Sequence, residues 1–231
     1  FLNWGQYTMN IKKKRTIILG VNNRIGDLVS LLKEENISIL VISKYVEQFS
    51  NELKDVETLN GDFLNKEMLE QADISNSDSV IILAETIGKS NSDVDARSVI
   101  ATLTVESIHP NTRTVVEVLS KETAYHLRNA NVDEIIESGK MTADMLAFST
   151  THPDFSNHLA TLLRFAHKNR IILSKVNENQ LNKTLSKVSA MCVKNRKILL
   201  GVRIDGRIYN ETLEPNYVIQ RDDVLVYIDM L

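Results

Sequence analysis

The stretch Arg15–Asp27, RTIILGVNNRIGD, decides how this chain of 231 residues folds. A short apolar run leads into Gly20, a loop follows, and Gly26 starts a pattern with helical spacing. This is the outline of a nucleotide-binding turn, in which a strand passes through glycines into the start of a helix. The dinucleotide fingerprint is incomplete, because Asn22 and Asn23 stand where the middle glycine belongs. The turn is therefore a working pocket, an altered pocket or a plain connection.

The composition places the chain among soluble globular proteins, with 43% hydrophobic and 25% charged residues. The net charge of −3 and the pI near 6.0 predict no nucleic-acid partner, which usually requires a basic face. No apolar run is long enough to cross a bilayer. The single cysteine, Cys192, excludes an internal disulfide and favours the cytosol, and we expect it to be packed. The five histidines show no metal-ligand spacing, so we expect no metal centre built from them.

Short β-branched runs alternate with helical patterns from residue 16 to residue 151. Strands are expected at 16–20, 37–43, 56–62, 78–84, 113–119 and 132–136, and helices at 24–35, 47–55, 65–74, 92–109, 121–130 and 140–151. This alternation predicts a Rossmann-like, doubly wound parallel sheet in the α/β class. The ligand crevice of such a sheet lies at the carboxyl ends of the strands, which is where the turn after the first strand also lies.

The pattern changes after residue 151. We expect an amphipathic helix at 155–167, a hairpin at 198–210 and a strand, polar turn and strand over 217–230. The pair Asp205-Gly206 suits the tip of the hairpin, because a type I′ turn needs positive φ at both positions. With little helix between these strands, we predict connecting helices followed by a small α+β domain. The apolar residues between 145 and 165 predict either packing on their own domain or a subunit interface.

Three stretches together resemble a known family: NGDFLNKEMLEQADI (60–74), the long segment from DVDARS to DEII (93–136), and LEPNYVIQRDDVLVYI (213–228). Their order and spacing are similar to the regulator of potassium conductance (RCK) domain, a TrkA-N domain followed by a TrkA-C domain. The last stretch departs from the family where Asp222-Asp223 replaces the usual Gly-Asp. The resemblance implies residues 16–151 as the Rossmann-like domain, residues 152–231 as the connecting helix and C-terminal subdomain, and residues 1–15 as a linker from an upstream pore.

The resemblance also implies a function. RCK domains are the cytosolic ligand-sensing parts of prokaryotic potassium channels and uptake systems, so we expect this chain at the cytoplasmic face of the cell membrane. They dimerise through the connecting helices and the C-terminal part, and four dimers form an octameric gating ring below the pore. The pore domain would belong to the same chain or to a sister chain. The ligands of the family are nucleotides or divalent cations.

The candidate binding residues follow the crevice that the predicted sheet would form. They are Gly20, Val21, Asn22, Asn23, Arg24, Ile25, Ser43, Lys44, Asp62, Phe63, Ala84, Glu85 and Glu117. Gly20 permits the tight turn, a helix N-terminus suits a phosphate, and Arg24 could reach one. At the end of the second strand an NAD site usually has a carboxylate, whereas this chain has Ser43 and Lys44, which suit a phosphate better. The alternative is a solvated lysine and a structural turn without ligand.

Two carboxylates complete this set. The resemblance places Asp62 near a nucleotide base or ribose, and its simple alternative is a helix N-cap. Glu117 lies inside a strand, where a carboxylate between apolar neighbours needs a partner. The resemblance allows Ca²⁺ there, but Leu83 and Leu119 stand where calcium-gated relatives have acids. Because Ca²⁺ takes about six to eight oxygen ligands, the usual calcium site is not supported, unless Glu85 compensates.

These observations favour an altered pocket for AMP, ADP or ATP rather than NAD, with an empty pocket as the alternative. The first hypothesis for the function is the gating domain of a potassium channel. A peripheral nucleotide-binding subunit of a potassium uptake transporter is the second. An NAD-dependent oxidoreductase is the third and is disfavoured, because both the glycines and the ribose acid are absent and no catalytic set of residues stands out.

Overall fold

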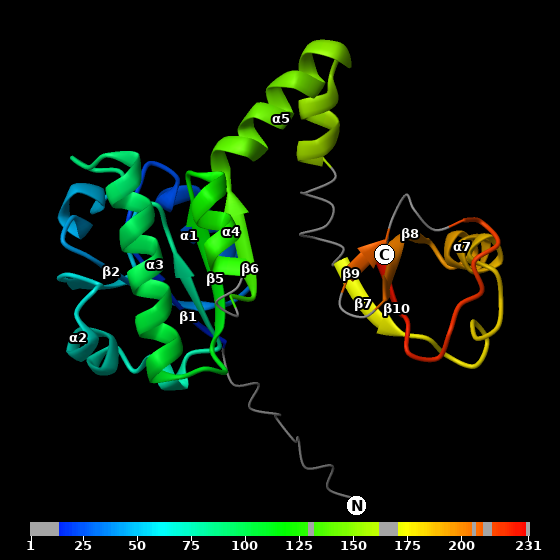
Figure 1. Ribbon diagram of the computed structural model, residues 1–231, viewed down its shortest axis with the longest axis horizontal. Coiled ribbons are helices and arrows are strands. Elements are labelled where there is room, and N and C mark those ends of the chain that lie inside the picture. The colour runs from blue at the N-terminus through cyan, green and yellow to red at the C-terminus, as the bar shows by residue number, and fades with distance from the viewer. Residues whose placement is uncertain (1–13, 129–131, 162–170, 205–206, 210–213, 230–231) are drawn as a thin grey trace, which may run out of the picture. The chain divides into compact units, whose positions relative to one another are not determined.

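The computed structural model describes residues 14–128, 132–161, 171–204, 207–209 and 214–229. The chain divides into two compact units, Phe1–Asp144 and Met145–Leu231, which are taken one at a time below (Figure 1). The expected linker falls almost wholly on residues 1–13 and lies outside the described part. Within that part, no helix is both long enough and apolar enough to span a membrane.

The N-terminal unit contains a parallel sheet of six strands. These are β1 (Arg15–Leu19), β2 (Ser38–Ser43), β3 (Glu57–Asn60), β4 (Ser79–Ile82), β5 (Arg113–Val118) and β6 (Glu134–Glu137). Their order is β3-β2-β1-β4-β5-β6, and all neighbours are parallel. The predicted Rossmann-like sheet is therefore confirmed. The strand order reverses between β1 and β4, which puts the ligand crevice of this fold at the end of β1.

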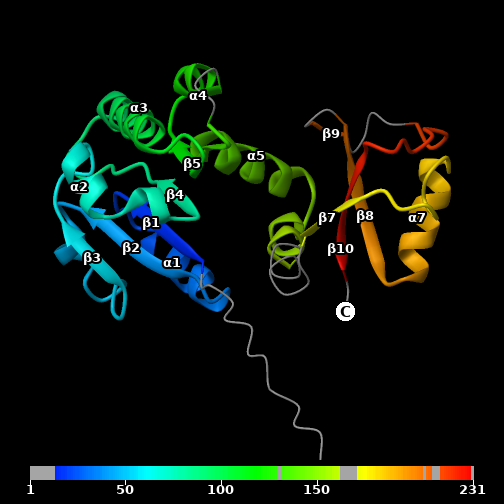
Figure 2. The same cartoon turned by 90° about the horizontal axis from the view of Figure 1, so that it is seen from below.

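Helices cover both faces of this sheet. They are α1 (Ile25–Glu34), α2 (Lys66–Gln71), α3 (Asn91–Ile108) and α4 (Lys121–Arg128), with single 3₁₀ turns at Val46–Phe49 and Ile74–Asn76. Figures 1 and 2 show α3 and α4 on one face and α1 on the other. Two apolar clusters result, one between the sheet and α2, α3 and α4, the other between the sheet and α1. Ile17, Ile18 and Leu19 of β1 are fully buried, as a central parallel strand requires.

The prediction of a helix at 47–55 is wrong. The structure has the 3₁₀ turn Val46–Phe49 and then turns that end at Asp55, whose φ is 62°. A helix of nine residues is marginal without a wide apolar face, and Ser50 and Asn51 favour turns. Packing decides the conformation instead, because Val46 and Leu53 bury their side chains in the cluster under α1.

The second unit contains an antiparallel sheet, which the sequence predicted as a small α+β domain. Its strands are β7 (Ile171–Lys175), β8 (Lys197–Ile204), β9 (Arg207–Tyr209) and β10 (Val224–Asp229), in the order β7-β10-β8-β9. Helix α7 (Leu185–Lys194) packs on one face through Val188 and Cys192. The pairing of β8 with β9 gives the expected hairpin, whose tip at 205–206 lies outside the described residues.

Three details of this unit differ from the prediction. Strand β7 and helix α7 had no counterpart in the sequence pattern. The strand expected at 217–220 is wrong, because only Val218 forms a bridge, with Thr184. The buried carboxylate of Asp223 explains this: it accepts hydrogen bonds from the Tyr217 hydroxyl at 2.9 Å and the Gln220 N–H at 2.8 Å, which folds the segment into a turn.

Helix α5 (Ser138–Thr151) leads from β6 across the boundary of the two units and buries none of its residues. Residues 155–161 form a further helical segment, and the remainder of the helix expected at 155–167 lies outside the described part.

Candidate functional site

The turn after β1 lies at the switch point of the sheet and has the backbone of a nucleotide-binding turn. Gly20 has a φ of 89°, and a Cβ at this position would lie 3.1 Å from the Leu83 carbonyl oxygen and 3.4 Å from the Phe63 ring. Glycine is therefore required by both the backbone angle and the space. Val21 and Ile25 are buried, and Asn23 is exposed.

Asn22 occupies the place of the missing glycine and crosses the crevice. Its side chain is buried, and its Nδ2 donates to the Ala84 carbonyl oxygen at 3.0 Å and to Glu117 at 3.2 Å. Its Oδ1 accepts the Arg24 N–H at 3.0 Å, and its carbonyl oxygen accepts the Ile25 N–H at 2.9 Å. Asn22 thus ties β1 to β4 and β5, and it satisfies two N–H groups at the start of α1 that an anion would otherwise use.

Glu117 is the buried carboxylate that the sequence predicted would need partners. It pairs with the Arg24 guanidinium and accepts the Ala84 N–H at 3.1 Å. The Glu117 side chain is 7% exposed and that of Arg24 is 58% exposed. The pair therefore has one fixed partner inside the unit and one partner that solvent or a ligand can reach.

Glu85 is a second buried carboxylate beneath the turn. It accepts a hydrogen bond from the Ser43 hydroxyl and a longer one, 3.4 Å, from the Val21 N–H. Lys89 forms an ion pair with it at 3.1 Å and lies over the Tyr45 ring, 4.7 Å from the centroid. Since Ser43 is fully buried, its hydroxyl is used within the unit and is not presented to the crevice.

Asp62, after β3, gathers two cations. Lys44 lies 2.8 Å from one carboxylate oxygen, and Arg97 from α3 lies 2.9 Å from the other. Asp62 does not cap a helix, contrary to the simple alternative from the sequence. Asn65 caps α2 by accepting from the N–H groups of Glu67 and Met68, whereas the backbone N–H that Asp62 accepts is that of Leu64, before the helix begins.

These contacts change the acidity of Asp62. Burial acts to raise its pKa, but the hydrogen bonds from Lys44, the Leu64 N–H and Arg97, with the charge of Arg97, outweigh burial and lower the pKa from 3.8 to about 2. The carboxylate is therefore ionised at neutral pH, and the three charged groups form a cluster with one positive charge in excess.

A cavity of about 460 Å³ adjoins the Arg24–Glu117 pair. It lies between α1, the sheet and the first turns of α5, and its walls are mostly apolar. The lining residues include Leu28, Ile81, Val115, Ile136 and Met141. The cavity thus joins the charged pair at the switch point to the beginning of α5 within the N-terminal unit.

The structure places the predicted residues in three groups at the carboxyl ends of the strands, where this fold has its ligand crevice. Asn22, Arg24, Ala84 and Glu117 lie over β4 and β5, Ser43 lies with Glu85 under the turn, and Lys44 lies with Asp62 at the ends of β2 and β3. The sequence interpretation missed Lys89 and Arg97. The available signal was their place shortly after β4, since segments that leave the carboxyl ends of strands border the crevice.

Among the described residues, no three or more His, Cys, Asp or Glu side chains form a group that could hold a metal ion. Glu85 lies under the turn with its own partners and does not join Glu117. Leu83 is buried in the cluster under α1. The carboxylates of the crevice therefore do not form the oxygen cage that Ca²⁺ needs.

A family comparison agrees with this architecture. Residues 16–138, more than half of the chain, match the family model described as the TrkA-N domain, and the chain belongs to this family. The match ends at residue 138, so the resemblance of the C-terminal part to a TrkA-C domain stays a prediction.

Solved structures show the same fold at low identity. The structure titled "Structure of the human SLO3 gating ring" superposes with a TM-score of 0.72 at 15% identity, over 93% of this chain and 44% of that chain. The structure titled "GsuK channel bound to NAD" gives a TM-score of 0.50 at 17% identity, over 94% and 36%. This chain therefore spans less than half of either protein. A comparison with curated proteins found no match.

Proposed function

We propose that this chain is the cytosolic ligand-sensing domain that gates a potassium channel, and that an adenosine mononucleotide is its ligand. The observation that carries the proposal is the asymmetry of the crevice. Asn22 and Glu117 fill the half over β4 and β5, whereas Lys44 and Asp62 are partly exposed over β2 and β3. The family match and the fold shared with the gating ring and channel structures support the regulatory role.

The first turn favours one phosphate over a pyrophosphate. Two N–H groups at the start of α1 are already bonded to Asn22, and the Asn22 side chain occupies the space that a middle glycine would leave. The Arg24 side chain remains accessible, and its guanidinium can bind a single phosphate group. AMP, ADP or ATP then binds over β1, β2 and β3, and NAD binds more weakly because its second half would meet Asn22 and Glu117.

The same pair offers a route from ligand to subunit contacts. A phosphate that draws Arg24 away leaves Glu117 buried without its main charge partner, which is costly. The neighbouring cavity, which reaches Met141 on α5, can change shape in response. For gating, the nucleotide must bind the two conformations with different affinity.

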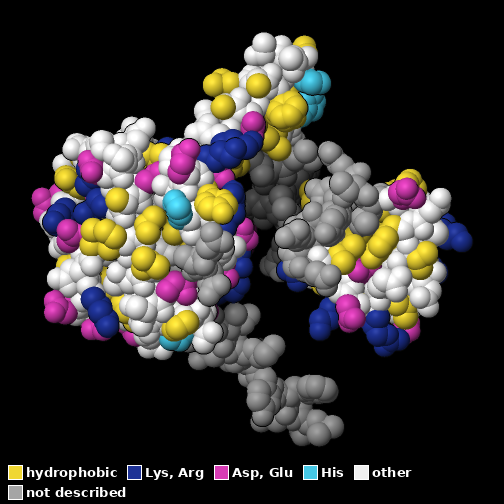
Figure 3. Space-filling model, in the orientation of Figure 1, with side chains coloured by type: hydrophobic (Ala, Val, Ile, Leu, Met, Phe, Trp, Pro, Cys, Tyr) yellow, Lys and Arg dark blue, Asp and Glu magenta, His cyan; other side chains and the backbone are white. Residues whose placement is uncertain are grey.

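Exposed apolar side chains support assembly into an oligomer. On α5, Met141 is 56%, Leu146 is 67% and Phe148 is 51% exposed. On α3, Ile100 and Leu103 are also about half exposed, and Figure 3 shows hydrophobic side chains gathered on the face that α3 and α4 cover. We propose that α5 forms a dimer contact and that dimers join into an octameric ring next to a potassium pore. A peripheral subunit of an uptake transporter would use the same surfaces.

We propose no catalytic activity. A hydride-transferring enzyme needs a complete cofactor cradle, and the serine at the end of β2 is buried against Glu85. Incubation of the chain with NADH and small carbonyl substrates should leave the absorbance of NADH unchanged.

Calorimetry tests the ligand. The chain is titrated with AMP, ADP, ATP, NAD, NADH and Ca²⁺, and the titrations are repeated with Arg24→Ala and Asp62→Ala. We expect a mononucleotide to bind most tightly, with a loss of roughly tenfold or more in Arg24→Ala, the size of one charge-assisted hydrogen bond. Binding of NAD far more tightly than any mononucleotide would show that Asn22 does not close the pocket.

A further inference from the structure

The end of β2 is where Rossmann-type sites distinguish one adenosine ribose from another. A carboxylate there accepts hydrogen bonds from the free ribose hydroxyls, and a cation there accommodates a phosphate on the ribose. In this chain the strand ends in Ser43 and Lys44. The Ser43 hydroxyl is buried and donated to Glu85, so Lys44, with a side chain 56% exposed, is the residue of this pair that a ligand meets.

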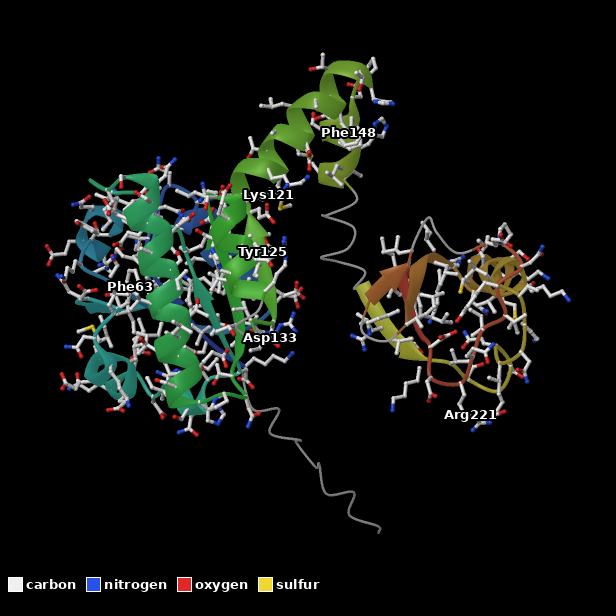
Figure 4. All side chains as sticks on the ribbon, viewed as in Figure 1. Phe63, Lys121, Tyr125, Asp133, Phe148 and Arg221 are labelled. Atoms are coloured by element: carbon white, nitrogen blue, oxygen red, sulfur yellow. The ribbon has the colours of Figure 1, made fainter. Side chains whose placement is uncertain are left out.

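Arg97 supplies a second cation at the same place. Its guanidinium and the Lys44 ammonium hold the two oxygens of one carboxylate, Asp62, at 2.9 and 2.8 Å. The guanidinium lies over the Phe63 ring, 4.7 Å from its centroid, which fixes its plane (Phe63 is labelled in Figure 4). Arg97 Nε is buried and has no hydrogen-bond partner within the described part of the chain.

The donors at this end of the crevice outnumber the acceptors. Lys and Arg side chains donate hydrogen bonds and accept none. The Asp62 carboxylate between them already accepts from both Lys44 and Arg97. A ribose diol would therefore compete with two cations for the Asp62 oxygens. A phosphomonoester brings two negative charges and three acceptor oxygens, and Arg binds such groups through two parallel hydrogen bonds. The exposed Lys44 can turn from Asp62 to the phosphate without disturbing the core.

We propose that the nucleotide of this crevice carries a phosphomonoester on the adenosine ribose, bound by Lys44 and Arg97. The inference rests on the proposed function, because it takes an adenosine nucleotide as the ligand and specifies its ribose. Arg24 binds the 5′-phosphate at the first turn, and Lys44 and Arg97 bind the ribose phosphate at the ends of β2 and β3. The ligand class is thus ribose-phosphorylated adenosine nucleotides.

The test compares ligands that differ by one phosphate. The chain is titrated at one ionic strength with 5′-AMP, 2′,5′-ADP and 3′,5′-ADP. We expect one bisphosphate to bind roughly ten- to hundredfold more tightly than 5′-AMP, the range of one or two charge-assisted hydrogen bonds. The two bisphosphates show which hydroxyl carries the phosphate. Lys44→Ala should reduce the gain by roughly tenfold, the size of one charge-assisted hydrogen bond, whereas Lys33→Ala, at an exposed lysine in the last turn of α1, should keep the full gain.

A charge reversal makes the test independent of any loss of folding. Lys44→Glu introduces a carboxylate at the end of β2, so the folded variant should prefer 5′-AMP over either bisphosphate. If 5′-AMP binds the wild-type chain as tightly as both bisphosphates, or if Lys44→Ala keeps the gain, this inference is wrong while the mononucleotide proposal stands. If none of the three ligands binds but 5′-ADP or ATP does, this inference alone is wrong. If 5′-ADP and ATP do not bind either, both proposals fail.

Discussion

Asn22 joins three strands that are far apart in the sequence. One side chain connects the turn after β1 to the Ala84 carbonyl oxygen after β4 and to Glu117 on β5. Buried groups of this kind stabilise a fold when every partner is satisfied, and they also fill space that a ligand would need. The position that defines a dinucleotide site in related folds is here part of the protein's own hydrogen-bond network.

Replacement of Asn22 tests both consequences. Asn22→Gly should lower the free energy of unfolding by about 2–3 kcal/mol, because it removes three hydrogen bonds and leaves Glu117 with fewer donors. It should also improve NAD binding relative to AMP. Asn23→Gly is the matched control, since Asn23 is exposed, and should cost less than about 1 kcal/mol. Urea denaturation and calorimetry measure the two effects, and equal destabilisation by both variants would contradict the network.

Asp62 makes stability depend on pH in a defined direction. Its pKa in the folded chain is about 2, below the ordinary value of 3.8, so the folded state binds this proton less readily than the unfolded state. The stabilisation from Lys44 and Arg97 is therefore present above about pH 4 and is lost as the pH falls to about 2.

The variant Asp62→Asn removes this pH dependence. The difference in free energy of unfolding between wild type and Asp62→Asn should be largest above about pH 5 and should shrink towards about pH 2. Glu122→Gln, an exposed acid on α4, controls for the loss of one negative charge. A difference that stays constant across this range would mean that the two cations do not stabilise Asp62 in solution.

At the scale of elements, α3 is attached to the end of β5 by a buried acid. The Asp95 carboxylate accepts the N–H groups of Leu119 at 2.8 Å and Ser120 at 2.9 Å. From the sequence alone, Asp93 and Asp95 are equivalent acids near the start of a helix, where the helix dipole favours a negative charge. Only Asp93 is exposed in the first turn, next to the cap Ser90, whereas Asp95 is a link between two elements.

This difference predicts unequal effects of the same substitution. Asp95→Asn should lower the free energy of unfolding by about 1–3 kcal/mol, because an amide offers one acceptor where the carboxylate offers two. Asp93→Asn on the same helix should cost less than about 1 kcal/mol, the usual limit for a charge near a helix start. Urea denaturation measures both effects. If Asp95→Asn leaves the free energy of unfolding unchanged, the hydrogen bonds from Asp95 to the end of β5 do not stabilise the fold.

How far the sequence could predict each element depended on its packing. Central strands such as β1 and β4 are buried on both faces, so their continuous apolar runs are visible without a structure. Residues 47–55 and 217–220 were assigned wrongly, because packing of Leu53 and a turn around Asp223 override local preference. In the site, the need of Glu117 for partners was predictable. The partners were not, because Asn22 and Arg24 precede it by more than ninety residues.

At the scale of the whole molecule, assembly should depend on α5. Met141, Met145 and Phe148 follow helical spacing i, i+4 and i+7, and the helix buries none of its residues. The Phe148 ring also lies 5.2 Å from that of Phe155, which extends the apolar surface beyond the helix. An apolar surface of this kind is expected to be covered in an oligomer.

Light scattering checks the assembly. The wild-type chain should be at least a dimer at micromolar concentration. Phe148→Glu places a charge in the apolar row and should shift the equilibrium towards monomer. Ala147→Glu, at an exposed position about a third of a helical turn away from Phe148, should shift it much less. A wild-type monomer, or equal effects of the two variants, would count against α5 as the subunit contact.

The central claim is that a nucleotide in this crevice regulates a potassium pore. It is tested most directly by rubidium flux into liposomes that contain this chain together with the potassium pore it is proposed to gate, with and without the nucleotide that binds the chain in calorimetry. We predict that the nucleotide changes the flux at concentrations near its dissociation constant, and that Arg24→Ala shifts this response to higher concentration by the factor measured in calorimetry. A flux that stays the same when the crevice is saturated with nucleotide would contradict the account.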